Sequence, residues 1–123
     1  MAQVPVVAVV DDDPAVCNSL KFSLELEGFL VRAYRSGAEL LDAGDLDAYR
    51  CFVIDQRLPL MNGLELIAKL RGRQIATPAI LVTSNPGAAL YERAAIAKVS
   101  IVEKPLLGNA LVEHIREACG GLA

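Results

Sequence analysis

Polar residues of a restricted set of types follow the short apolar runs of this 123-residue chain. Asp11-Asp12-Asp13 follow the first run, Asp55 the third, Thr83-Ser84 the fourth and Lys104-Pro105 the fifth. Carboxylates gathered at one place repel one another, which raises their pKa values unless a cation compensates. Oxygen ligands with room left for water suit Mg²⁺ or Mn²⁺, whereas zinc favours His or Cys. These residues therefore predict a site for a hard divalent cation.

A divalent cation beside a carboxylate, a hydroxyl and an ammonium group is suited to phosphoryl transfer. The cation and a lysine offset the charge of the phosphoryl oxygens, and a hydroxyl can donate a hydrogen bond to one of them. A carboxylate can itself accept the group and become an aspartyl phosphate. Asp55 is the best candidate acceptor, because it stands alone after its run whereas Asp11 and Asp12 are adjacent, as ligands would be.

The elements that must position these residues alternate along the chain. The apolar runs predict strands over residues 6–10, 30–34, 51–54, 79–83 and 99–102. Short apolar runs separated by segments with helical periodicity are typical of a parallel α/β sheet. Five such repeats cannot close an eight-stranded barrel, so we expect an open doubly wound sheet. Its functional crevice should lie beyond the carboxyl ends of the strands.

Helix-start signals lie between the predicted strands. They are Asp13-Pro14 before a helix that should stop near Gly28, the capping box Ser36 to Glu39, and Asn62 with Glu65. The first helix should bury a stripe of Val16, Leu20 and Leu24. Further helices are expected over residues 87–98 and 107–119. Asp13 is better interpreted as a helix cap than as a ligand.

Composition favours one domain over residues 1–123. Apolar residues make up 54% of the chain and charged residues 22%. A net charge of −3 without a basic run argues against nucleic acid or an acidic membrane surface as the main partner. Cys17, Cys51 and Cys119 lack the spacing of metal or redox sites and are expected to be buried or bystander thiols. With no apolar stretch of roughly 18 residues, a cytoplasmic protein is expected.

Four segments together resemble the receiver domain of two-component response regulators, across essentially the whole chain. They are Val9-Val10-Asp11-Asp12-Asp13-Pro14, Asp55-Gln56-Arg57-Leu58-Pro59-Leu60-Met61-Asn62-Gly63, Thr83-Ser84 and Glu103-Lys104-Pro105. Each segment alone is weak, but all four occur in order and each follows a predicted strand. The resemblance implies a flavodoxin-like (βα)₅ sandwich whose five parallel strands, numbered along the chain, have the order 2-1-3-4-5.

The resemblance also implies roles for the acidic residues. Asp55 would accept a phosphoryl group from a phosphohistidine on a sensor histidine kinase or a histidine phosphotransfer protein. Asp12 and Asp55 would bind Mg²⁺ directly, Asp11 would act mainly through water, and the backbone carbonyl of Arg57 would complete the protein ligands. Mn²⁺ could replace Mg²⁺ in this set.

Residues after the last two strands would respond to phosphorylation. Thr83 would bond a phosphoryl oxygen and move, and Lys104 would pair with the phosphoryl group and the acidic cluster. The peptide bond from Lys104 to Pro105 would be cis, a conformation that only X-Pro bonds adopt at modest cost. The family usually has an aromatic switch residue three positions before the lysine, where this chain has Ile101. The coupling to an output is therefore open.

The signal would leave through the fourth helix, the fifth strand and the fifth helix. This surface would control a downstream output protein or domain and could form a homodimer. Tyr91, Ala94, Val112 and Arg116 are candidates for its exposed residues, although they could equally be ordinary surface.

Two other functions compete with a phosphoacceptor. A degenerate receiver would bind a partner without phosphorylation, but the acidic and lysine positions are intact. An aspartate-dependent phosphatase would carry D-x-D after the first strand, a spacing that Asp11 and Asp13 satisfy. Turnover of a small phosphate ester that survives Asp55→Asn would favour the phosphatase.

Overall fold

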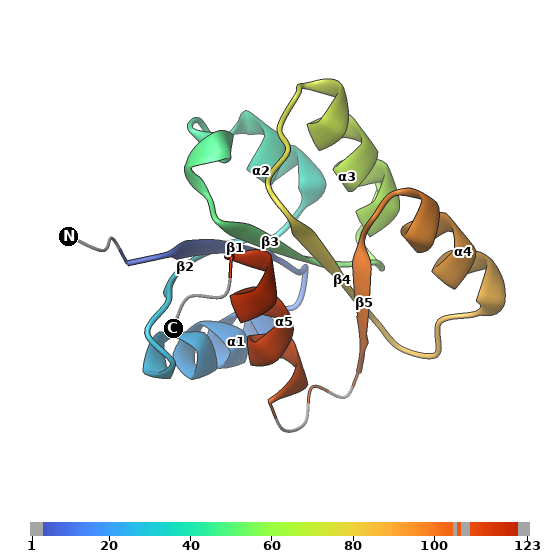
Figure 1. Ribbon diagram of the computed structural model, residues 1–123. Helices are drawn as coiled ribbons and strands as arrows, with labels where there is room; N and C mark the ends of the chain where they lie inside the picture. Colours follow the sequence, from blue (N-terminus) through green and yellow to red (C-terminus); the bar gives the residue numbers. More distant parts are fainter. Residues whose placement is uncertain (1–3, 105, 107–108, 121–123) are drawn as a thin grey trace.

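The computed structural model describes residues 4–104, 106 and 109–120, which form alternating strands and helices (Figure 1). The strands are β1 (Val6–Val10), β2 (Leu30–Tyr34), β3 (Cys51–Asp55), β4 (Ala79–Thr83) and β5 (Ser100–Glu103). The helices are α1 (Pro14–Leu26), α2 (Gly37–Asp42), α3 (Gly63–Gly72), α4 (Ala88–Ile96) and α5 (Ala110–Ala118), with a 3-10 turn, η1, at Leu46–Ala48. Among these residues no helix has the length and apolar character needed to cross a bilayer.

The five strands form one parallel sheet in the order β2-β1-β3-β4-β5, which confirms the predicted topology. β1 lies between β2 and β3, so the chain leaves β1 in one direction and then crosses back to the other side. Loops after β1 and β3 therefore diverge at the carboxyl edge of the sheet, which is where open α/β sheets generally bind ligands. Asp11 and Asp55 lie at this switch point.

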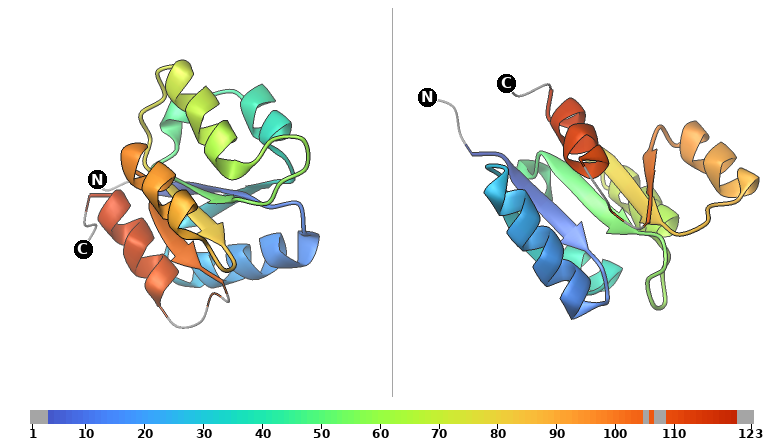
Figure 2. Two further views of the ribbon diagram at one scale, coloured as in Figure 1. Left: turned by 90° about the vertical axis from the view of Figure 1, so that its right-hand side faces the viewer. Right: turned by 90° about the horizontal axis from the view of Figure 1, so that it is seen from below.

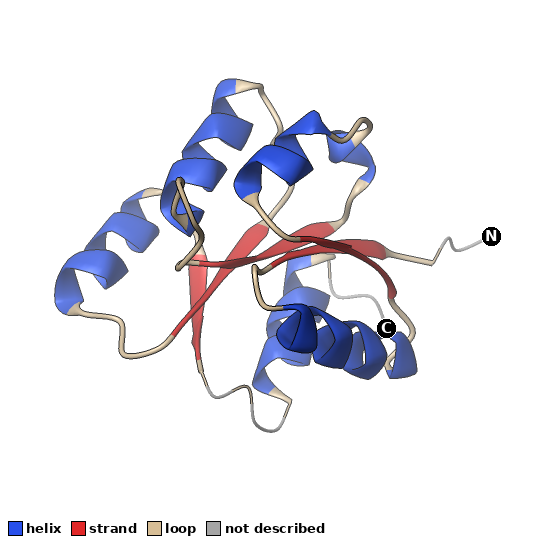
Figure 3. Ribbon diagram, turned by 180° about the vertical axis from the view of Figure 1, so that it is seen from behind, coloured by secondary structure: helices blue, strands red, loops and turns tan. Residues whose placement is uncertain are grey.

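Both faces of the sheet are covered, which explains why its inner strands are apolar throughout. Side chains alternate between two cores along each strand, with Ala8, Phe52 and Leu81 on one face and Val7, Val53 and Ile80 on the other. Helices α2, α3 and α4 cover the first face and α1 and α5 the second, as Figures 2 and 3 show. β2 lies at an edge, as its alternating pattern predicted.

The three predicted helix starts are confirmed by their capping bonds. The Asp13 carboxylate accepts from the Ala15 N–H, and the Ser36 hydroxyl accepts from the Glu39 N–H. Asn62 makes the complete capping box, in which its side chain accepts from the Glu65 N–H and the Glu65 carboxylate accepts from the Asn62 N–H. These bonds satisfy N–H groups that a helix start otherwise leaves without partners.

Some predicted boundaries and buried positions are wrong. α4 is shorter than residues 87–98, because the Val99 N–H returns to the Ala94 carbonyl and closes the helix end, and β5 accordingly begins at Ser100. α5 is described from Ala110, and the predicted start at 107 lies outside the described residues. In α1 the buried residues are Cys17 and Leu24, whereas Val16 and Leu20 of the predicted stripe are only half-buried.

One residue proposed for the exposed surface of α4 is wrongly placed. Ala94 is 1% exposed and packs in the core beneath α4. A small apolar side chain lets the helix approach the sheet closely, so this residue belongs to packing and not to a partner surface. All three cysteines are buried, as expected.

Candidate functional site

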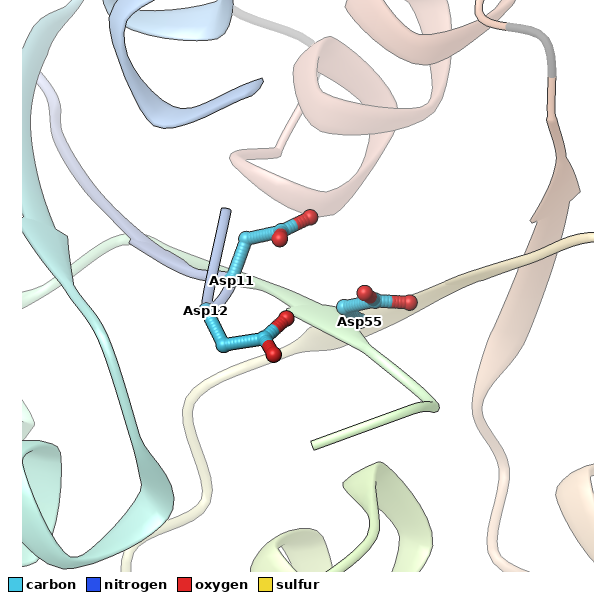
Figure 4. Close-up of side chains that lie close together, drawn as sticks. All are labelled: Asp11, Asp12 and Asp55. Atoms are coloured by element: carbon cyan, nitrogen blue, oxygen red, sulfur yellow. The ribbon is translucent and has the colours of Figure 1, made fainter. Parts of the chain in front are cut away.

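Three carboxylates meet at the switch point between β1 and β3. Asp11 and Asp12 directly follow β1, and Asp55 is the last residue of β3. One carboxylate oxygen from each lies within 4.8 Å of the others, and Figure 4 shows the three side chains converging from the two strand ends. Asp11 and Asp55 are buried, whereas Asp12 is exposed. An all-oxygen set that is open to water on one side fits a hard divalent cation.

Lys104 brings positive charge to these aspartates from the end of β5. Its Nζ lies 3.3 Å from Oδ2 of Asp55 and 3.8 Å from Oδ2 of Asp11. The backbone holds it there, because the Lys104 N–H donates to the Thr83 carbonyl at 2.8 Å and extends the β4–β5 pairing by one residue. One ammonium group thus faces both buried carboxylates and offsets part of their charge.

The electrostatics of Asp11 reflect its crowded position. Burial is the largest cause that raises the pKa of Asp11 above its ordinary value, and the negative charge of Asp55 acts in the same direction. The Asp13 N–H, which donates to Oδ1 of Asp11 at 2.9 Å, and the Lys104 ammonium lower this pKa in part. A bound divalent cation would favour the charged form of Asp11 and so oppose the effects of burial and of the neighbouring carboxylates.

The loop after Asp55 is tied to the start of α3. The Arg57 N–H donates to Oδ1 of Asp55 at 3.3 Å. The side-chain carbonyl of Gln56 accepts from the Leu64 N–H at 3.0 Å, and its backbone carbonyl accepts from the Gly63 N–H at 3.0 Å. A side chain at Gly63 would place its Cβ 2.8 Å from the Asp55 carbonyl oxygen. The acceptor strand and α3 are therefore held in direct contact.

Thr83 and Ile101 lie on β4 and β5, the two strands that follow β3 toward one edge of the sheet. Thr83 ends β4 and is buried, and its hydroxyl donates to the Ser84 carbonyl at 3.4 Å. Ile101 is half-buried on β5 and packs on the side of the sheet that α4 covers. The predicted cis bond from Lys104 to Pro105 lies outside the described residues.

Comparison with known proteins identifies the family. Residues 7–116 match the family described as the response regulator receiver domain. The chain belongs to this receiver family. It is a signalling domain of two-component systems, and receivers of this family generally bind Mg²⁺.

A relative and two solved structures support the assignment. The transcriptional regulatory protein FixJ of Azorhizobium caulinodans is 36% identical over 115 residues, which cover 93% of this chain. This receiver spans 54% of that relative, about half its length. A crystal structure of FixJ-N is 31% identical, with a TM-score of 0.86 and coverage of 99% of this chain and 98% of that one. The structure of the chemotaxis protein CheY4 of Vibrio cholerae is 19% identical and shares the fold. Its TM-score is 0.85, and the match covers 94% of this chain and 99% of that one.

Three features around the receiver's site were not predicted from the sequence. The Cys17 thiol donates to the Asp11 carbonyl at 3.2 Å, Gln56 caps α3, and the Tyr91 hydroxyl of α4 donates to Glu103 beside Lys104. Cys17 falls one helical turn after the predicted cap, which is the one signal that could have placed it near Asp11. The other two contacts join segments that lie close together in space, and no local sequence pattern indicates this proximity.

Proposed function

We propose that Asp55 accepts a phosphoryl group from a phosphohistidine on a sensor histidine kinase or a histidine phosphotransfer protein. The observation that carries this proposal is the placement of Asp55. Its carboxylate lies 3.3 Å from the Lys104 ammonium and among two further aspartates, at the carboxyl edge of a receiver fold. No other carboxylate of the cluster ends a strand in the middle of the sheet.

The residues present fit a divalent cation, Mg²⁺ or Mn²⁺. Asp12 and Asp55 would bind it directly, Asp11 mainly through water, and the Arg57 backbone carbonyl would complete the protein ligands. When bound, the cation neutralises charge on the phosphoryl oxygens. Burial and the negative charge of Asp55 both raise the pKa of Asp11, and a bound cation would favour its charged form.

In the transfer itself, a carboxylate oxygen of Asp55 forms a bond to phosphorus while the bond from phosphorus to the donor's imidazole nitrogen breaks. The imidazole leaves with the electron pair, and the product is an acyl phosphate. Lys104 exchanges its contact with Asp55 for one with a phosphoryl oxygen. Thr83 turns its hydroxyl from the Ser84 carbonyl to another phosphoryl oxygen, and this movement starts the switch.

The response then reaches partners through α4, β5 and α5. This surface controls a downstream output protein or domain and can form a homodimer. Binding of nucleic acid belongs to such an output and not to this chain, whose charge is −3. A cytoplasmic location is part of this proposal, because it fits these proposed partners.

Labelling with a small phosphodonor tests the acceptor role. The protein is incubated with acetyl phosphate and Mg²⁺, and intact mass is measured. We expect a gain of one phosphoryl group, abolished by Asp55→Asn and by omission of Mg²⁺. The exposed Asp47, which lies in η1 away from the cluster, supplies the matched control Asp47→Asn, which should label normally.

Unchanged labelling of Asp55→Asn would show that another residue accepts the group. A wild-type chain that binds a partner but is never labelled would favour the degenerate receiver. Steady hydrolysis of a small phosphate ester by Asp55→Asn would favour the phosphatase.

A further inference from the structure

One hydrogen bond joins α4 to the end of β5. The Tyr91 hydroxyl donates to Oε2 of Glu103 at 2.6 Å. Tyr91 is 43% exposed and Glu103 is also exposed, so the bond lies at the surface. Within the described residues it is the one side-chain hydrogen bond that α4 makes. The angular position of α4 relative to β5 therefore depends on few interactions.

The apolar packing of α4 is also sparse. Ala94 is its one buried residue, and Leu90 is half-buried against the same core. Ile96, at the end of the helix, is 84% exposed. Gly87 provides no side-chain cap at the start. A helix with so little buried surface can change position at low cost, provided that its single polar bond breaks.

The acceptor of this bond is next to the proposed site. Glu103 directly precedes Lys104, whose ammonium contacts Asp55. Glu103 is also the register partner of Thr83, and the Thr83 carbonyl accepts from the Lys104 N–H at 2.8 Å. A force on the Glu103 side chain therefore acts on the strand end that holds Lys104 and on the neighbouring Thr83.

Ile101 makes this connection more important. An aliphatic side chain at this position has no polar group that could bond α4 or the β4–α4 loop. The chain instead carries the phenol on α4 and its acceptor on β5. The short distance shows a well-formed bond to a carboxylate, a class of hydrogen bond stronger than a neutral pair.

We propose that the Tyr91–Glu103 hydrogen bond positions the end of β5, including Lys104, and couples phosphorylation of Asp55 to the position of α4. This rests on the proposed acceptor role of Asp55. Tyr91 and Glu103 are positioning residues, since neither contacts the phosphoryl group. The bond holds α4 in the arrangement of the unphosphorylated protein, and movement of Lys104 and Thr83 toward the phosphoryl group breaks it. Coupling is reciprocal, so breaking the bond must favour the phosphorylated arrangement.

The test removes the phenol hydroxyl in the full chain with Tyr91→Phe. Without a phosphodonor, we expect the backbone amide resonances of α4, Thr83 and Lys104 to move toward their positions in the phosphorylated wild type. With acetyl phosphate and Mg²⁺, labelling of Asp55 should be faster by about fivefold, because exposure to solvent reduces the contribution of this bond to that of an ordinary hydrogen bond. A purely structural role would leave the labelling rate unchanged.

Matched variants separate this bond from general effects of losing a hydroxyl. Tyr34→Phe removes a tyrosine hydroxyl that bonds Tyr49 beneath the opposite edge of the sheet, so α4 and the labelling rate should not respond. Glu103→Gln retains an acceptor oxygen and should behave more like the wild type, whereas Glu103→Ala should behave like Tyr91→Phe.

Two results overturn the proposal. One is that the α4, Thr83 and Lys104 resonances and the labelling rate of Tyr91→Phe match the wild type. The other is that Tyr34→Phe produces the same changes. Failure of the acceptor role is seen separately, as a wild-type chain that acetyl phosphate and Mg²⁺ do not label.

Discussion

Helices α3 and α4 cover the same face of the sheet but are attached to it very differently. α3 begins with a complete capping box and buries Gly63, Leu64, Leu66, Ile67 and Leu70. α4 follows Gly87, which provides no side-chain cap, and buries only Ala94. The helix that follows the proposed acceptor is thus fixed, and the helix that follows Thr83 is loosely held. A switch requires both, because the site must stay in place while the surface that reports it moves.

The attachment of α3 reaches the proposed site directly. Gly63 lies against the Asp55 backbone, and Gln56 bonds the first turn of the helix. Displacing α3 would displace Asp55. Among the described residues, the one side-chain hydrogen bond of α4 joins it to Glu103, the neighbour of Lys104. The contrast can be tested by equal substitutions in the two helices.

Truncating a leucine of α3 should have the largest effect. Leu66 is fully buried, so Leu66→Ala removes packed methyl groups and leaves a cavity, at a cost of about 3 kcal/mol in the free energy of unfolding. Ile96→Ala in α4 is the control and should change stability by less than about 0.5 kcal/mol. Urea denaturation measures both. Similar losses from the two variants would show that the helices are equally anchored.

Adding one methyl group at the two helix starts should give the next largest difference. In Gly63→Ala, the new Cβ would meet Cδ1 of Leu81 at 2.6 Å and the Asp55 carbonyl oxygen at 2.8 Å. We expect a loss of about 2 kcal/mol from overpacking, with slower labelling of Asp55. Gly87→Ala is the matched control, because nothing lies within 4 Å of the added atom. A stable Gly63→Ala protein with normal labelling would contradict the tight contact.

The titration of Tyr91 should give the smallest effect and concerns α4 alone. The hydrogen bond to Glu103 is the largest cause that raises the pKa of Tyr91, because the neutral phenol is the donor. The stabilisation by this bond is therefore complete below the ordinary tyrosine pKa and is lost as pH rises through the raised value. Glu103→Ala, which removes the acceptor, should lower the pKa of Tyr91 toward its ordinary value, as followed by NMR of the ring resonances.

Glu92→Gln on the same helix is the control for this titration. It removes an exposed charge without removing the hydrogen bond and should shift Tyr91 much less. A Tyr91 pKa that does not respond to Glu103→Ala would mean that the bond does not form in solution.

Much of the fold could be predicted because its signals are local. A capping side chain acts within three residues, as Ser36 and Asn62 do, and each apolar run of strand length lies within a single strand. The predicted end of α4 and the predicted start of β5 were wrong, because the Val99 N–H bonds back to the Ala94 carbonyl and ends the helix early. The turn after α4 requires a positive φ at Lys98, and lysine is not one of the residue types that indicate a turn in a sequence.

The sequence by itself determined that carboxylates, a hydroxyl and a lysine would follow successive parallel strands, because strand direction places all such residues at one edge of a sheet. Only the tertiary structure decided that Lys104 faces both Asp55 and Asp11, and that Tyr91 meets Glu103. The reason is physical. The order of residues settles which edge of the sheet they occupy, whereas contacts between side chains depend on how far each strand is shifted and how each helix packs across the sheet.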